Sequence, residues 1–138
     1  MSDPATYVLT GGCHCGAVRY AAAGRPFYRT LCHCTICRGT TGAPAVAWFT
    51  VRLREFQFIQ GQPRSFRSSA QATRTFCGTC GTALSSRRDG RDEVDITTAS
   101  LDEPAAAAPE DQTYSRSRLP WMDGVASLPR HETTRPRS

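Results

Sequence analysis

The sequence predicts a mainly β fold. Its apolar and β-branched runs are short and are separated by glycine, proline and serine, a pattern typical of strands joined by turns. Helical periodicity is scarce, and 138 residues leave no room for a second core. We therefore expect one domain over residues 1–138, with a core at about 8–132 and polar, flexible ends.

The expected elements follow along the chain. Seven segments have strand character: residues 18–21, 45–51, 56–60, 65–68, 73–77, 82–86 and 93–98. Residues 35–39 are expected to form one short helical turn. Residues 105–108 form an alanine run between Pro104 and Pro109, and we expect a loop there because both prolines interrupt a helix.

Composition limits the protein class. Hydrophobic residues make up 39% of the chain, so the core should be thin and a metal ion would help to stabilise it. No segment approaches the roughly 20 apolar residues that cross a bilayer, and the N-terminus lacks the pattern of a secretion signal. We expect a soluble, cytoplasmic protein without a membrane partner.

The net charge of +5 arises from seventeen basic residues, all of them arginine. A mixed, solvated surface explains this charge most simply. The alternative is a basic face that receives a small anionic ligand or nucleic acid. Aromatic residues do not alternate with the arginines as in an RNA-binding signature, and this disfavours nucleic acid.

Seven cysteines fall into three clusters. The clusters are Cys13 and Cys15, then Cys32, Cys34 and Cys37, and finally Cys77 and Cys80. An odd number leaves one thiol over in a disulfide framework, and a reducing cytoplasm opposes disulfides. Cysteines two or three residues apart bring their sulfurs to one point, so the spacing favours metal coordination.

The first and third clusters are expected to form one zinc site. Cys77 and Cys80 are each followed by glycine, which permits the tight turn of a zinc knuckle. A redox CxxC motif would open a helix, whereas residues 82–86 have strand character. Two cysteines cannot fill a tetrahedral site, and Cys13 with Cys15 completes four thiolates.

The middle cluster is expected to bind a second zinc with one coordination position open. Cys32, Cys34 and Cys37 supply three thiolates within six residues, and the fourth position is left to water or a substrate. The alternatives are a closed site completed by His14, His33 or a distant group, and no second metal. His33 fits poorly because neighbours in an extended chain point to opposite faces.

These motifs resemble the family of glutathione-dependent formaldehyde-activating enzymes, which shares its domain with centromere protein V. The resemblance covers residues 8–132 approximately. The segments that carry it are Gly11 to Tyr20, Cys32 to Arg38 with Gly42-Ala43-Pro44, Arg74 to Thr82, Ser100-Leu101-Asp102, Leu119-Pro120-Trp121 and Leu128-Pro129.

The resemblance implies a fold of several small, coiled antiparallel sheets around zinc sites, called a beta-tent. It also implies two zinc ions, with Cys13, Cys15, Cys77 and Cys80 as the structural site and Cys32, Cys34 and Cys37 as the catalytic, thiol-binding site. The implied activity is that of a carbon–sulfur lyase which adds a thiol such as glutathione to formaldehyde or a related aldehyde. The alternative function is a zinc-stabilised binding module for protein or nucleic acid, without catalysis.

Two further residues have open roles. Arg38 either pairs with an anionic ligand or the charged zinc site, or is a surface arginine. Trp121 either lines a substrate pocket or belongs to the core. No pair of carboxylates has a spacing that suggests acid–base catalysis, and no oligomeric state follows from the sequence.

Overall fold

The structure is a computed structural model, and it describes residues 8–137. Ten strands form two sheets, which confirms the mainly β prediction. The smaller sheet has the order β1-β2-β5, and all its pairs are antiparallel. Its strands are β1 (Val8–Gly12), β2 (Arg19–Ala23) and β5 (Phe56–Gln60).

The larger sheet has the strand order β10-β3-β4-β9-β8-β7-β6. Its pairs are antiparallel except β10 with β3, which run parallel. The strands are β3 (Phe27–Cys32), β4 (Val46–Arg52), β6 (Arg64–Arg67), β7 (Ala72–Phe76), β8 (Ala83–Arg88), β9 (Glu93–Thr97) and β10 (Asp111–Thr113).

Helical structure is confined to short segments. The helix α1 (Thr35–Thr41) extends the expected turn and ends at Gly42, whose φ of 75° is left-handed. The short 3-10 helices are η2 (Leu53–Glu55), η3 (Thr98–Ser100), η4 (Pro104–Ala107), η5 (Ser115–Ser117) and η6 (Pro120–Ser127). No helix within residues 8–137 combines the length and apolarity needed to cross a membrane.

All seven expected strands are present, and their ends agree within two residues. The expectation of a loop at residues 105–108 was wrong, because Pro104 occupies the first turn of η4, where its missing N–H costs nothing. Strands β1, β3 and β10 were not predicted. Glycines occupy β1, a bulge interrupts β3, and β10 has only three residues, all polar.

Two apolar clusters pack within this frame. The main core contains Tyr20, Phe49, Leu84 and Ile96, all fully buried, and it includes Cys13 and Cys77. The second cluster is small and consists of Cys32, Cys37, Val46 and Trp48. Each cysteine group is therefore associated with a different apolar cluster.

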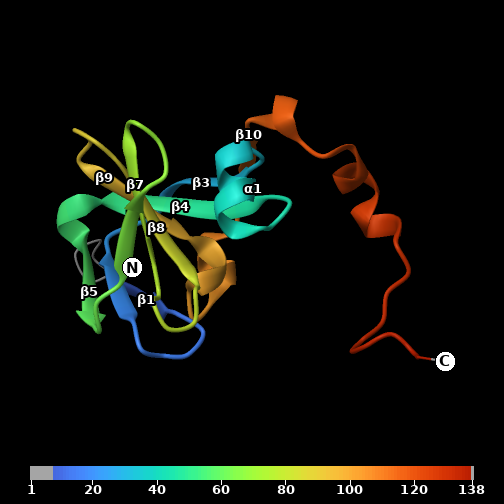
Figure 1. Cartoon of the computed structure of the whole chain (residues 1–138), viewed down its shortest axis with the longest axis horizontal. Coiled ribbons are helices and arrows are strands. Elements are labelled where there is room, and N and C mark those ends of the chain that lie inside the picture. The colour runs from blue at the N-terminus through green and yellow to red at the C-terminus, as the bar shows by residue number, and fades with distance from the viewer. Residues whose placement is uncertain (1–7, 138) are drawn as a thin grey trace, which may run out of the picture.

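The C-terminal segment leaves the body of the protein after η5 (Figure 1). Helix η6 contains no buried residue, and Trp121 on it is 57% exposed. Trp121 does not line the cleft described below. Both roles considered for Trp121, core residue and pocket residue, were wrong.

Candidate metal centre and cleft

Two similar turns bring the four-cysteine group, Cys13, Cys15, Cys77 and Cys80, together. One turn joins β1 to β2 and the other joins β7 to β8. In each turn the amide of the first cysteine donates to the carbonyl five residues on, at Val18 and at Thr82. Gly16 and Gly81 have φ of 81° and 83°, so both turns need the left-handed conformation that glycine adopts readily.

The sulfur geometry of this group suits a metal ion. All seven cysteines are free, and the four sulfurs lie within 4.8 Å of one another. Cys13 Sγ is 3.6 Å from Cys15 Sγ, which lies 3.8 Å from Cys77 Sγ. Tetrahedral zinc–sulfur bonds of about 2.3 Å place neighbouring sulfurs about 3.8 Å apart. The four-cysteine group could therefore hold a tetrahedral metal ion.

Hydrogen-bond donors surround these sulfurs. The Val18 amide donates to Cys13 Sγ at 3.2 Å, and the Cys80 amide donates to Cys77 Sγ at 3.4 Å. The hydroxyl of Thr82, 3.2 Å from Cys80 Sγ, and neighbouring amides lower the pKa of Cys80 to about 5. These donors favour the thiolate, which is the form that binds metal.

The three-cysteine group, Cys32, Cys34 and Cys37, lies where β3 passes into α1. Cys32 ends β3, Cys34 caps α1, and Cys37 lies in its first turn. The Cys34 sulfur accepts the Cys37 amide at 3.2 Å. Capping thus fixes the spacing of two sulfurs before any metal binds.

The sulfurs of this group also lie within 4.8 Å of one another, with 3.6 Å between Cys37 Sγ and Cys32 Sγ. Hydrogen bonding from Cys37 lowers the pKa of Cys32 to about 7, although burial opposes this. The same contact, together with burial, raises the pKa of Cys37. Three sulfurs could hold a metal ion and leave one tetrahedral position unfilled.

Neither His14 nor His33 belongs to these sulfur groups. His33 is buried, and its Nε2 lies 2.8 Å from Oε1 of Gln112 on β10. The His14 side chain is exposed, and its backbone amide donates to Thr82 Oγ1. The two histidines considered as fourth ligands therefore have other surroundings.

A cleft of about 570 Å³ borders the three-cysteine group. All three of its cysteines line this cleft, together with Tyr28, Tyr114 and Trp48. Its charged lining consists of Arg74, Arg88, Arg91, Arg116, Glu93 and Asp95. Four guanidinium groups against two carboxyl groups give the cleft a basic character suited to an anionic ligand.

Arg74, on β7, is the charged residue in contact with the three-cysteine group. Its Nη2 donates to Cys37 Sγ at 3.6 Å, its Nη1 donates to Thr40 Oγ1, and its guanidinium lies 5.4 Å from the Trp48 ring centre. Arg74 was not singled out from the sequence, whereas Arg38, next to Cys37 in the chain, was considered either as a partner of the zinc site or an anionic ligand or as a surface arginine. Arg38 instead donates to the backbone carbonyl of Ser117 at 2.6 Å.

Asp95 lines the cleft and belongs to a polar row across the sheet. Arg74 pairs with Ser86, Ser86 with Asp95, and Asp95 with Thr50, so these side chains share one sheet face. Thr50 donates to Asp95 at 2.6 Å. Partial burial raises the pKa of Asp95, while Thr50 and the nearby arginines oppose the shift.

The carboxyl groups of Glu93 and Asp95 thus reach one cleft, although the sequence suggested no acid–base pair. Their spacing of two residues on a strand was the available signal, since alternate residues face one side. Their cross-strand neighbours belong to β4 and β8, and only the folded sheet reveals those pairings.

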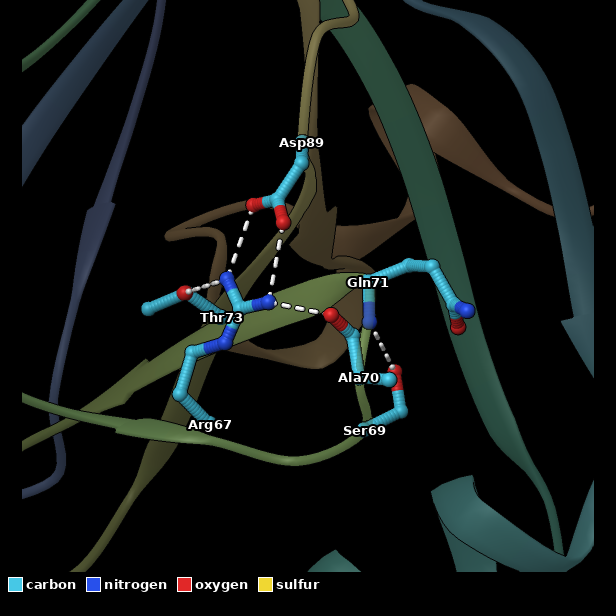
Figure 2. Close-up of polar contacts among 6 residues, drawn as sticks. All are labelled: Arg67, Ser69, Ala70, Gln71, Thr73 and Asp89. Atoms are coloured by element: carbon cyan, nitrogen blue, oxygen red, sulfur yellow. Dashed lines mark hydrogen bonds and ion pairs between the residues drawn. The ribbon is translucent and has the colours of Figure 1, made fainter.

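The loop at one edge of the cleft is fixed by Arg67 (Figure 2). Its guanidinium forms a two-point ion pair with Asp89, with both N–O distances 2.8 Å, and also donates to Thr73 and to the Ala70 carbonyl. This loop presents Ser68, whose hydroxyl accepts from Arg74 Nε at 3.1 Å. The edge of the cleft is therefore connected to Arg74 by hydrogen bonds.

Comparisons with known proteins agree with this arrangement. The family model described as "Glutathione-dependent formaldehyde-activating enzyme" matches residues 8–117. A Halomonas elongata protein, provisionally named a glutathione-dependent formaldehyde-activating enzyme, is 31% identical over an alignment of 85 residues that covers 56% of this chain and 54% of that protein. The matched region thus spans about half the length of this relative.

The fold also resembles a solved structure. The crystal structure of a Rhodobacter sphaeroides protein matches with a TM-score of 0.60 at 25% identity, covering 75% of this chain and 99% of that one. The family match includes both cysteine groups and ends before η6. The chain belongs to the family of glutathione-dependent formaldehyde-activating enzymes.

Proposed function

We propose that the protein is a zinc-dependent enzyme of the carbon–sulfur lyase type. It binds a thiol such as glutathione at the three-cysteine group and promotes addition of this thiol to formaldehyde or a related aldehyde. The observation that carries this proposal is the three-cysteine group bordering a basic cleft. Family membership and the name of the Halomonas elongata relative support glutathione and formaldehyde as substrates.

The donor sets support zinc as the metal in both groups. Thiolates are soft ligands that zinc prefers, and the sulfur separations fit a tetrahedral ion. Four cysteines complete the coordination of a structural zinc, while three leave a position for a substrate sulfur. Bound zinc supplies a Lewis acid that favours the thiolate form of a thiol ligand.

The remaining cleft residues bind and orient the substrate in this proposal. Arg88, Arg91 and Arg116 line the cleft and would pair with the carboxylates of a peptide thiol. Arg74 offsets the negative charge of the cysteine sulfurs through its contact with Cys37. The cleft thereby holds the thiol in one orientation for the aldehyde to approach.

The addition also needs a proton carrier. The sulfur lone pair forms a bond to the carbonyl carbon, the carbon–oxygen π bond breaks, and the oxygen takes up a proton. The thiol loses one proton when it binds, so no net proton is consumed. We assign Asp95 to accept this proton and return it to the oxygen, directly or through a water, because it lines the same cleft as the three-cysteine group and burial raises its pKa.

None of the seven cysteines forms a disulfide, which supports a reducing compartment, and we propose the cytoplasm. We also propose that one domain with a core at about residues 8–132 carries the activity. The pairing of β10 with β3 beside Cys32 supports this proposal as far as residue 113, whereas η6 beyond it contains no buried residue.

Calorimetry with two ligands tests the proposed function. The zinc-loaded protein should bind glutathione, while S-methylglutathione, which has the same carboxylates but no thiol, should bind far more weakly. Elemental analysis should give two zinc ions per chain. Equal binding of both compounds, or a single zinc in the native protein, would contradict a thiol site at the three-cysteine group.

A further inference from the structure

Two exposed tyrosines line the cleft in a conformation that is unfavourable for them. Tyr28 has a φ of 48° and Tyr114 a φ of 53°, and within residues 8–137 they are the two non-glycine residues with positive φ. The left-handed region brings Cβ too close to the backbone and costs free energy. Strained residues of this kind are concentrated at ligand sites.

Tyr28 lies in a bulge of β3. Phe27 pairs with Thr50 and Thr30 pairs with Trp48, so β3 has one more residue than β4 over this interval. Such a bulge redirects a side chain. The Tyr28 side chain is 67% exposed, and its aromatic partner is Phe27, 4.9 Å between ring centres. The exposed ring adds little to the packing of the core.

Tyr114 is held in position from both sides. Before it, Thr113 pairs with Cys32, and the His33 amide donates to the Thr113 carbonyl at 3.0 Å. After it, the Ser117 amide donates to the Tyr114 carbonyl, and Arg38 binds the Ser117 carbonyl. These contacts tie Tyr114 to the loop and helix of the three-cysteine group, while its ring is half exposed.

We propose that Tyr28 and Tyr114 form an aromatic clamp that holds the backbone of a peptide-like thiol whose sulfur occupies the three-cysteine group. This inference rests on the proposed function. A tyrosine ring offers apolar faces and a polar hydroxyl, which suits alternating methylene and amide groups. The clamp favours binding of an elongated thiol, which contacts both rings. A small thiol reaches the three-cysteine group without contacting either ring, so it gains nothing from the clamp.

Glycine substitutions separate this role from a structural one. Tyr28→Gly and Tyr114→Gly in the zinc-loaded protein should each weaken glutathione binding about tenfold, since aromatic anchors dominate ligand contacts. Binding of 2-mercaptoethanol should be unchanged. The melting temperature should stay equal or rise, because glycine adopts positive φ without strain. Calorimetry and thermal unfolding measure these effects.

Trp121→Ala is the matched control, because Trp121 is an exposed aromatic residue outside the cleft. This substitution should change neither the Kd for glutathione nor the Kd for 2-mercaptoethanol. If the glycine variants bound glutathione and 2-mercaptoethanol equally more weakly, the three-cysteine group would be damaged and the clamp would be overturned. An unchanged Kd for glutathione, or a large fall in melting temperature, would also overturn it. If the unmodified protein bound neither thiol, the proposed function itself would fail.

Discussion

The two cysteine groups use the same ligand atom in different surroundings. Cys13 and Cys77 of the four-cysteine group belong to the main core, beside Tyr20 and Leu84. Cys32 and Cys37 of the three-cysteine group belong to a small cluster with Trp48, next to a cleft. In the proposed function, the number of cysteines and their position in the fold, more than ligand chemistry, distinguish a structural zinc from a zinc that is open to substrate.

The groups also connect the chain differently. The four-cysteine group joins two turns more than 60 residues apart, whereas the three-cysteine group lies within six consecutive residues. Losing a metal from the first group frees two distant segments, while losing one from the second frees a single loop. Stability should therefore depend mainly on the four-cysteine group and ligand binding on the three-cysteine group.

Replacing Cys77 by serine should have the largest effect. Cys77 is fully buried, and its loss removes a ligand from the group that joins β1–β2 to β7–β8. Metal binding at a structural site of this kind is coupled to folding, so we expect a loss on the order of 5 kcal/mol, enough to unfold a typical domain. Circular dichroism at room temperature with zinc analysis measures the outcome.

Replacing Cys34 by serine should spare the fold and abolish thiol binding. The hydroxyl can still cap α1, so helix geometry survives, but the three-cysteine group loses one thiolate. We expect one zinc per chain, a near-normal melting curve and no heat on adding glutathione. Unfolding as complete as that of the Cys77 variant would show that both groups stabilise the protein and would remove the contrast between them.

The three cysteine clusters were visible in the sequence because cysteine spacing is a local property, and the four ligands of a tetrahedral site joined the first cluster to the third, 62 residues away. Clusters such as Cys32-His33-Cys34 bring their sulfurs together independently of the surrounding sheet, and Cys77 with Cys80 needs only one turn, in which Gly81 has positive φ. The short strands were likewise visible as runs between turn residues. Local sequence features therefore sufficed for the cysteine clusters and for most strands.

The residues that line the cleft could not be predicted from local sequence in the same way. Arg74 meets Cys37 through sheet pairing and lies 37 residues from it in the chain, while Arg38 is adjacent to Cys37 but binds Ser117. Tyr114 reaches the site only because β10, with no apolar residue, pairs in parallel with β3. Such contacts depend on long-range register, which a single sequence does not specify.

Replacing Asp95 by asparagine tests whether the cleft supplies a proton carrier. Asparagine Oδ1 can still accept from Thr50, but the amide cannot carry the proton. We expect addition of glutathione to formaldehyde to slow on the order of a hundredfold, with glutathione affinity little changed. Exchange NMR of glutathione with formaldehyde measures the rate, and an unaltered rate would exclude Asp95 as the proton carrier.

The Asp95→Asn variant also tests how the stability of the protein depends on pH. Burial raises the folded-state pKa of Asp95, so the protonated form is favoured by folding, and this contribution is lost as pH rises through the folded pKa. Asp95→Asn does not titrate at this position. The melting temperature of Asp95→Asn minus that of the unmodified protein should therefore increase as the pH rises from about 4 to 7. A difference that does not change with pH would contradict a raised folded-state pKa for Asp95.

Replacing Arg74 by lysine should have the smallest effect of these changes and should act on one cysteine group only. Lysine keeps the positive charge but loses the planar fork that joins Cys37, Thr40 and Ser68. Removing an outer partner of a metal ligand typically costs about tenfold or more in metal affinity. Chelator competition should thus show that Arg74→Lys binds one of its two zinc ions about tenfold more weakly. Arg87→Lys, on the exposed end of β8, is the control and should change the affinity for neither zinc ion. If both zinc ions were weakened alike, the two groups would be coupled through the sheet, because Arg74 lies on the strand that leads to Cys77.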